Sequence, residues 1–322
     1  RDHMLEMGRW ECWSWIAWRE NRFEPDAIFD LSYGENSATL AIGYDWLHDT
    51  LDDGERRAIL AVMRRPVAAF LKHTAPESRV WWFGKRDSNW NTVCAGGAGM
   101  LALACDEEFP EAALILARAC ESIDPFVEEI RAVNGAWPEG IGYWNYGMRY
   151  LYMFVLSLEQ ATGWRSPWLD GREVRDALAF PMRFAPYPGC ACSFGDVNQW
   201  SPLPFHLAAA RRLRQPAVLS DLKRRLQPPK AGTDTWPNAA ELLCLHDAAP
   251  SVPPPRTAPF LHHYKGLDWV VLADRMPAPR LYASVRGGTT EVPHGHVDLT
   301  SFHAVVGGEK MIDSLGPAQY LD

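Results

Sequence analysis

Two histidines and an aspartate near the C-terminal end of this sequence have side chains that could carry out chemistry. His294 and His296 lie one residue apart in "VPHGHVDLTSF" (292–302), and Asp313 follows in "EKMIDSLG". The stretch reads as a strand, in which alternate side chains share a face, so we expect both imidazoles on one face. Imidazole and carboxylate are zinc ligands, and imidazole also exchanges protons near neutral pH. The alternative interpretation is a pair of surface histidines without a role.

Amide side chains mark a predicted helix start in "KRDSNWNTVCAGGAGM" (85–100). Asn89 and Asn91 flank Trp90 there. Asparagine caps helices well, which is one interpretation. The other is an amide that faces a cleft and donates a hydrogen bond to a substrate oxygen.

A third stretch, "NGAWPEGIGYWNYGMRY" (134–150), combines a glycine-rich turn with aromatic residues. Loops on a rigid scaffold often carry functional side chains. Tyr143, Tyr146 and Tyr150 also follow helical spacing, which is typical of a stripe of core residues.

The composition limits the classes of partner. The 322 residues include 15 Trp, and the formal net charge is −8. This charge argues against nucleic acid as the main partner, whereas indole faces suit sugar rings. No apolar run is long enough to span a membrane. The seven cysteines are an odd number, and we interpret most as buried thiols.

The apolar spacing predicts a chain that is mainly α and then β. Helical periodicity extends over residues 1–246, with Asp52 or Asp53 as the cap of one helix and a kink or break at Pro66. A proline-rich linker follows at 247–259, and residues 260–322 read as the start of an antiparallel sheet domain, with strand-like stretches at 267–275, 279–288, 299–308 and 309–315. The opening residues read as the interior of an amphipathic helix, so we expect any signal peptide upstream and further sheet beyond Asp322.

The three stretches, taken together in this order, resemble the heparinase II/III-like polysaccharide lyases and their alginate-lyase relatives. The motifs are "SNWNTVCAGGAGMLALA", "GAWPEGIGYWNYGMRYL" and "HGHVDLTSFHAVVGGEKMIDSLGPAQY". The resemblance covers the chain from about residue 30 onward. It implies an (α/α) toroid followed by an antiparallel β-sandwich, here truncated, and β-elimination on a polysaccharide or oligosaccharide that contains uronic acid.

The resemblance also implies roles for single residues. Tyr143 occupies the place of the catalytic tyrosine, His294 that of the catalytic histidine, and Asn89 or Asn91 that of the residue that holds the substrate carboxylate. Several relatives have histidine in the first stretch, where this chain has two asparagines and a tryptophan, and this departure leaves alginate, glycosaminoglycan and other uronate polymers open. Further substrate contacts are expected from Trp90, Glu139, Trp144, Tyr146, Arg149 and Arg286.

A structural zinc is implied as well. His296 and Asp313 match two of its ligands, and the third, a histidine, would lie beyond Asp322. A polymeric substrate makes a periplasmic or secreted location our expectation, with the cytoplasm as the alternative. Two other functions stay open. One is a glycoside hydrolase on an (α/α) toroid, for which Glu139 is one of the two carboxylates required. The other is a glycan-binding relative with weak catalysis.

Overall fold

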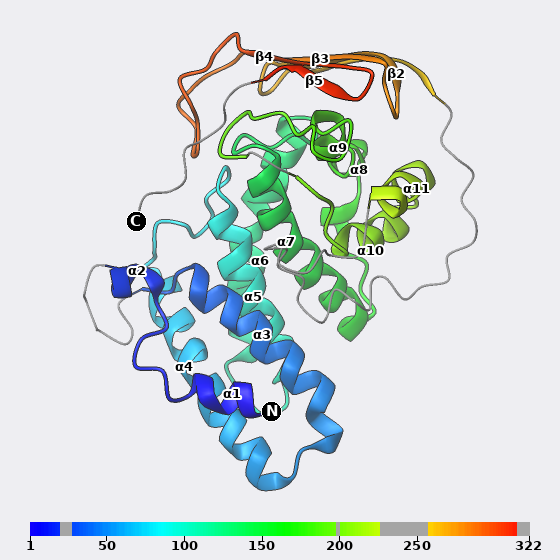
Figure 1. Cartoon of the computed structure of the whole chain (residues 1–322). Coiled ribbons are helices and arrows are strands. Elements are labelled where there is room, and N and C mark those ends of the chain that lie inside the picture. The colour runs from blue at the N-terminus through cyan, green and yellow to red at the C-terminus, as the bar shows by residue number, and fades with distance from the viewer. Residues whose placement is uncertain (20–27, 198–199, 226–256, 314–322) are drawn as a thin grey trace. The chain divides into compact units, whose positions relative to one another are not determined.

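The structure, a computed structural model, describes residues 1–19, 28–197, 200–225 and 257–313 (Figure 1). Helices occupy the described chain up to Arg225, and five strands follow between Ala258 and Ile312. The predicted order, helices and then antiparallel strands, is confirmed. The chain forms two compact units. Unit 1 comprises Arg1–Phe126 with Tyr150–Ser166, and unit 2 comprises Val127–Arg149 with the described residues from Pro167 onward.

Unit 1 is helical. Its core holds a cluster of large aromatic side chains, in which the Phe29 and Phe70 rings lie 5.2 Å apart and the Trp82 indole donates to the Phe29 carbonyl. Helix α3 packs along α5, and the last two helices, α6 and α7, belong partly to each unit. The helices are α1 (Asp2–Met7), α2 (Trp15–Arg19), α3 (Leu31–Leu47), the 3-10 turn η1 (His48–Thr50), α4 (Asp53–Thr74), α5 (Asn89–Ala104), α6 (Ala112–Ala132) and α7 (Ile141–Thr162).

Helix α4 shows how local chemistry sets these elements. Asp52 caps it with a complete capping box, because its carboxylate accepts from the Glu55 N–H while the Glu55 side chain accepts from the Asp52 N–H. The prediction of a cap at this point is confirmed. The helix continues through Pro66 to Thr74, so a break at Pro66 is wrong. Pro66 and its neighbour Val67 are buried, and packing of this face holds the helix together across the missing hydrogen bond.

Unit 2 begins with the first half of α7 and continues through short helices. These are η2 (Pro167–Leu169), α8 (Arg172–Ala177), α9 (Phe180–Phe184), α10 (Phe205–Arg212) and α11 (Pro216–Arg225). The helical periodicity near residues 172–180 corresponds to two short helices, α8 and α9. Residues 226–246 of the region predicted to be helical and residues 247–256 of the expected linker lie outside the described residues.

The five strands form one antiparallel sheet in sequence order, β1 to β5 (Figure 1). One face is buried. There Tyr264 and Trp269 pack against Phe180 and Phe184 of α9, with ring centroids 5.2 to 6.1 Å apart, and the Arg183 guanidinium donates to the Tyr264 hydroxyl. The strands are β1 (Ala258–Tyr264), β2 (Trp269–Met276), β3 (Leu281–Arg286), β4 (Phe302–Val306) and β5 (Glu309–Ile312).

Large apolar side chains cover much of the other face of the sheet. Leu261, Leu281 and Met311 are each more than half exposed. The strand β1 begins at Ala258, within the segment expected to be linker, and sequence reasoning did not predict it. Among the helices that the structure describes, none combines the length and the apolar character required to cross a membrane.

Candidate active site

The phenol ring of Tyr143 and the imidazole of His294 lie face to face in unit 2. Their ring centroids are 3.7 Å apart and their planes differ by 18°. Tyr143 stands in the first turn of α7, and His294 stands in the loop that joins β3 to β4. A helix and a loop between two strands therefore bring a phenol and an imidazole into contact.

Asp196 holds both histidines of the H-x-H motif. Its Oδ2 lies 2.8 Å from Nδ1 of His294, and its Oδ1 lies 2.6 Å from Nε2 of His296. A carboxylate only accepts hydrogen bonds, so each of these ring nitrogens carries a hydrogen. The His294 side chain keeps 28% of its surface exposed.

The expectation that residues 292–302 form a strand is wrong. Residues 287–301 form a loop, in which the Gly295 N–H donates to the Val292 carbonyl and His294 adopts a φ of 56°. Pro293 offers no N–H to a sheet ladder, and a positive φ takes the chain out of the strand conformation. The two rings converge on one carboxylate through this turn and not through strand alternation.

Close backbone approaches bring the loops of the site together. A Cβ on Gly140 would lie 2.5 Å from the Phe194 carbonyl oxygen, and a Cβ on Gly195 would lie 2.9 Å from that of Glu139 and 3.3 Å from that of His294. Both glycines also have positive φ angles, 90° and 79°. Only glycine tolerates both conditions, so these positions set the distance between the segments that carry Tyr143, Asp196 and His294.

An ion pair fastens the loop that carries the histidines. Arg286, at the end of β3, is 1% exposed, and its guanidinium bonds the carboxylate of Asp298 and the Thr289 carbonyl. The Arg286 backbone also exchanges hydrogen bonds with the loop, donating to Ser301 and accepting from Thr300. The sequence predicts a substrate contact for Arg286, whereas the structure uses its side chain inside the protein.

The other residues of unit 2 that the sequence predicts to contact substrate differ in their burial. Tyr146 is half-buried on α7, like Tyr143. Glu139 is 1% exposed and accepts from the Trp137 indole, and Arg149 is 8% exposed. Trp144 is 1% exposed and stacks on His206 in the core. On this helix, Trp144 therefore belongs to the core, whereas Tyr143 and Tyr146 stay partly exposed, as a site requires.

The two asparagines of unit 1 are both buried at the start of α5, where Ser88 provides the cap. The Asn91 amide donates to the carbonyls of Lys85 and Ser122, and its oxygen accepts from the Ser122 hydroxyl. Asn91 therefore joins two segments of unit 1. Trp90 between them is half-buried.

The residues expected to bind zinc have other partners in the structure. His296 bonds Asp196, while Asp313 bonds Lys310 and lies 4.0 Å from Nε2 of His303. Among the described residues, no group of three or more His, Cys, Asp or Glu side chains is placed to hold a metal ion. We derive no step of the mechanism through a metal.

Burial separates Tyr143 from two other tyrosines of unit 2. Burial raises the pKa of Tyr264 to about 12 even though Arg183 contacts its hydroxyl, and burial also raises the pKa of Tyr282. Both side chains therefore stay protonated at neutral pH. Tyr143, by contrast, is half-buried and stacks on an imidazole.

Sequence reasoning missed Asp196, the residue that joins the two histidines. Its signal, a Gly-Asp pair after the C-x-C of "CACSFGDVNQW", is weak because many turns contain this pair. It also missed Asp298, although this residue ends the "HGHVD" stretch. No model of a known protein family matches this chain, and no curated protein matches it.

Proposed function

We propose that this chain is a polysaccharide lyase that cleaves a polysaccharide containing uronic acid by β-elimination. The observation that carries the proposal is the stacking of Tyr143 on His294, whose Nδ1 donates to Asp196. The fold we propose is the (α/α) toroid and β-sandwich of the family that the motifs resemble. The proposed partner is the acidic polymer itself, and we propose a periplasmic or secreted location for an enzyme that acts on it.

The reaction requires a base and stabilisation of a negative charge. The base removes the proton from C5 of the uronate, the C4–O bond breaks, and a C4=C5 double bond forms. In our proposal the Tyr143 phenolate takes the C5 proton and returns a proton to the leaving oxygen O4. No water is consumed, which distinguishes this reaction from hydrolysis.

The two histidines assist Tyr143 by their charge. A tyrosine with an ordinary pKa near 10 needs about 4 kcal/mol of stabilisation of its phenolate to act near pH 7. The His294 imidazole stacks on Tyr143 and shares the Asp196 carboxylate with His296, so a proton taken up by this cluster would place positive charge beside the phenol. A positive charge at this range favours the phenolate and also attracts the substrate carboxylate.

A neutral donor suits the substrate carboxylate when charge builds on it in the transition state. Asn89 is our proposal for this donor, because its separation from Tyr143 in the sequence matches the motif of the family that the chain resembles. An amide stabilises the enolate-like intermediate in the manner of an oxyanion hole and does not titrate. Zinc bound by His296 and Asp313 remains a separate prediction, which metal analysis of the purified protein tests.

The test is an ultraviolet absorbance assay on a panel of polymers: alginate, polygalacturonate, hyaluronan, heparosan and chondroitin. Elimination leaves a conjugated double bond in the product, so absorbance rises as chains are cut. We expect a rise with at least one polymer and no rise with the Tyr143→Phe variant. New reducing ends without absorbance would identify a hydrolase, and no cleavage of any polymer would contradict the proposal.

A further inference from the structure

The loop between α4 and α5 places two adjacent tryptophans in opposite environments. Trp82 is fully buried, and its indole donates a hydrogen bond to the Phe29 carbonyl in the core of unit 1. Trp81 keeps 53% of its surface exposed. Burial of the Trp82 ring stabilises the fold, whereas an indole surface left in water does not, so packing alone does not explain Trp81.

Hydrogen bonds hold this loop in place. The Val80 N–H donates to the His73 carbonyl near the end of α4. The Gly84 N–H donates to the Ser122 hydroxyl of α6. The loop is thereby tied to two helices, and Trp81 is held outward between these two points. A ligand that stacks on this indole meets a surface that is already ordered, which lowers the entropic cost of binding.

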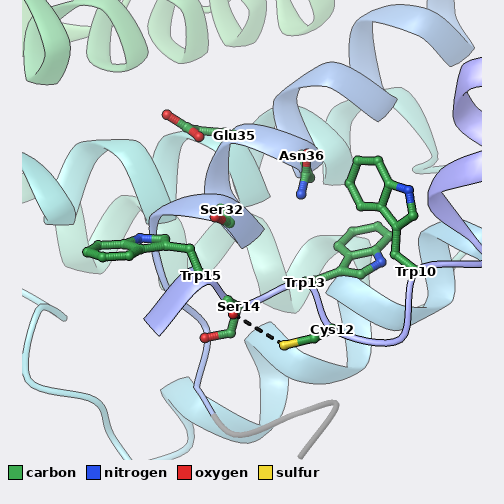
Figure 2. A pocket seen from close by; sticks show the side chains of 8 residues that line it. All are labelled: Trp10, Cys12, Trp13, Ser14, Trp15, Ser32, Glu35 and Asn36. Carbon is green, nitrogen blue, oxygen red and sulfur yellow. Dashed lines mark hydrogen bonds between the residues drawn. The ribbon is translucent and has the colours of Figure 1, made fainter. Parts of the chain in front are cut away.

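Two further indoles continue the surface that Trp81 begins. The Trp81 ring centroid lies 5.0 Å from that of Trp90, in the first turn of α5, and the Trp90 ring lies 6.4 Å from that of Trp15 in α2. Trp90 and Trp15 are both half-buried. Figure 2 shows Trp15 at a surface pocket of about 310 Å³ beside the start of α3. We call Trp81, Trp90 and Trp15 the tryptophan platform.

The chemistry of the platform favours a sugar ring as its occupant. Indoles present flat faces on which the C–H face of a pyranose packs, and each carries one N–H that can donate to a hydroxyl. The charged side chains of the same loop form ion pairs. Lys85 lies 3.0 Å from Asp87, and Arg79 lies 3.1 Å from Glu121 of α6. These side chains stay partly exposed, and they offer donors and acceptors to sugar hydroxyl groups.

We infer that the tryptophan platform is a subsite for a pyranose ring of the polymer that the enzyme cleaves. Trp90 directly follows Asn89, the proposed donor to the substrate carboxylate, so the platform and this donor begin the same helix. The platform then holds the sugar next to the uronate at Asn89. Trp81 and Trp15 are contacts that the sequence did not indicate. The identity of the polymer rests on the proposed function, whereas the stacking of a sugar on the platform does not.

Isothermal titration calorimetry on the full chain tests the platform directly. The probes are hexasaccharides from the five polymers of the absorbance assay, with cellohexaose as an uncharged probe. The protein carries Tyr143→Phe, so that elimination does not consume a probe. We expect at least one probe to bind saturably.

Variants of Trp81 separate stacking from a general effect on the fold. Trp81→Ala should weaken binding about tenfold, whereas Trp81→Tyr keeps an aromatic face and should weaken it less than about threefold. The matched control is Trp46→Ala, which removes a 46% exposed indole of α3 outside the platform and should bind as tightly as the parent protein.

Several results would overturn the inference. They are the absence of binding to any probe, equal affinities of Trp81→Ala and Trp46→Ala, and equal losses in Trp81→Ala and Trp81→Tyr. Self-association of the parent protein that Trp81→Ala abolishes, measured by light scattering, would assign the surface to a second copy of the chain instead. The absorbance assay is independent of these titrations. Elimination together with unchanged affinity in Trp81→Ala removes the platform alone, whereas binding that depends on Trp81 without elimination removes the lyase alone.

Discussion

The imidazole of His294 stacks on the phenol of Tyr143 at 3.7 Å, and the same imidazole donates through Nδ1 to Asp196. Each ring limits the movement of the other, and the carboxylate fixes which imidazole nitrogen carries hydrogen. The first predictions concern these contacts.

Tyr143→Phe should lower the turnover of elimination by about a hundredfold or more, because it removes the group that carries the proton. The melting temperature should change little, since the half-buried ring and its stacking on His294 are retained. Initial rates of absorbance and a thermal melt measure the two effects. Tyr187→Phe is the control, because it removes a tyrosine hydroxyl of unit 2 that binds the Pro279 carbonyl. More than a tenth of the wild-type turnover in Tyr143→Phe would exclude this tyrosine as the base.

Asp196→Asn should lower turnover by about a hundredfold, because an amide both donates and accepts and so no longer fixes which nitrogens of the two imidazoles carry hydrogen. Circular dichroism should show a folded protein. The exposed Asp170→Asn variant, also in unit 2, removes a charge away from the histidines and should keep full turnover. Equal activity of the two variants would show that the contacts of Asp196 have no catalytic consequence.

Asp298→Ala should reduce the free energy of unfolding by about 3 to 5 kcal/mol, since it leaves the Arg286 guanidinium buried without its carboxylate. The double variant Arg286→Met with Asp298→Leu should recover most of this loss, because no charge stays buried. Urea denaturation of the two variants and the wild type measures the difference. A double variant no more stable than Asp298→Ala would contradict the role of the pair as the anchor of the histidine loop.

The asparagines at the start of α5 should differ in what they affect. Asn91→Ala should cost about 1 to 3 kcal/mol of unfolding free energy, because the buried Ser122 hydroxyl loses its acceptor and the Ser122 carbonyl loses the amide donor. Asn89→Asp should lower turnover more than Asn89→Ala, since a carboxylate repels that of the substrate. Denaturation curves and initial rates separate the two roles. Full turnover of Asn89→Asp would remove Asn89 from the reaction.

Acidification should destabilise the protein through two buried histidines. Burial lowers the pKa of His206 to about 3 and that of His303 to about 4, from an ordinary value of 6.5. Below pH 6.5 the unfolded chain therefore binds more protons than the folded chain. Stability is complete above this pH and falls by about 1 kcal/mol per pH unit for each histidine as the pH approaches the folded pKa. Denaturation between pH 7 and pH 4.5 should show a shallower fall for His206→Leu than for the wild type, and identical slopes would contradict the assignment.

Local patterns in the sequence predict much of the fold. The helical spacing, the Asp52 cap and four of the five strands follow from periodicity and from side chains near in sequence. The break at Pro66 is wrong because packing of the buried face outweighs the local cost of proline. The strand β1 was missed because proline-rich composition continues up to its first residues.

The site is harder to predict because its contacts join distant segments. The motif indicates Tyr143 and His294, but spacing does not indicate that their rings touch. Asp196 lies in a loop whose composition is common to many turns, and only the folded chain shows its two histidine partners. The sequence predicts Arg286 at the surface, where it would contact substrate. In the structure its side chain is buried and forms an ion pair with Asp298 of the histidine loop.

Unit 2 is built from separate stretches of the sequence, and this has a consequence for protein engineering. A chain divided within residues 247–259 would leave Tyr143 and Asp196 in one polypeptide and both histidines in the other. Neither polypeptide alone would contain the stacked rings. Their reunion would depend on the aromatic contacts of Phe180 and Phe184 with the sheet. The protein is thus suited to fragment complementation, in which recovered catalysis reports that the two polypeptides have reassembled.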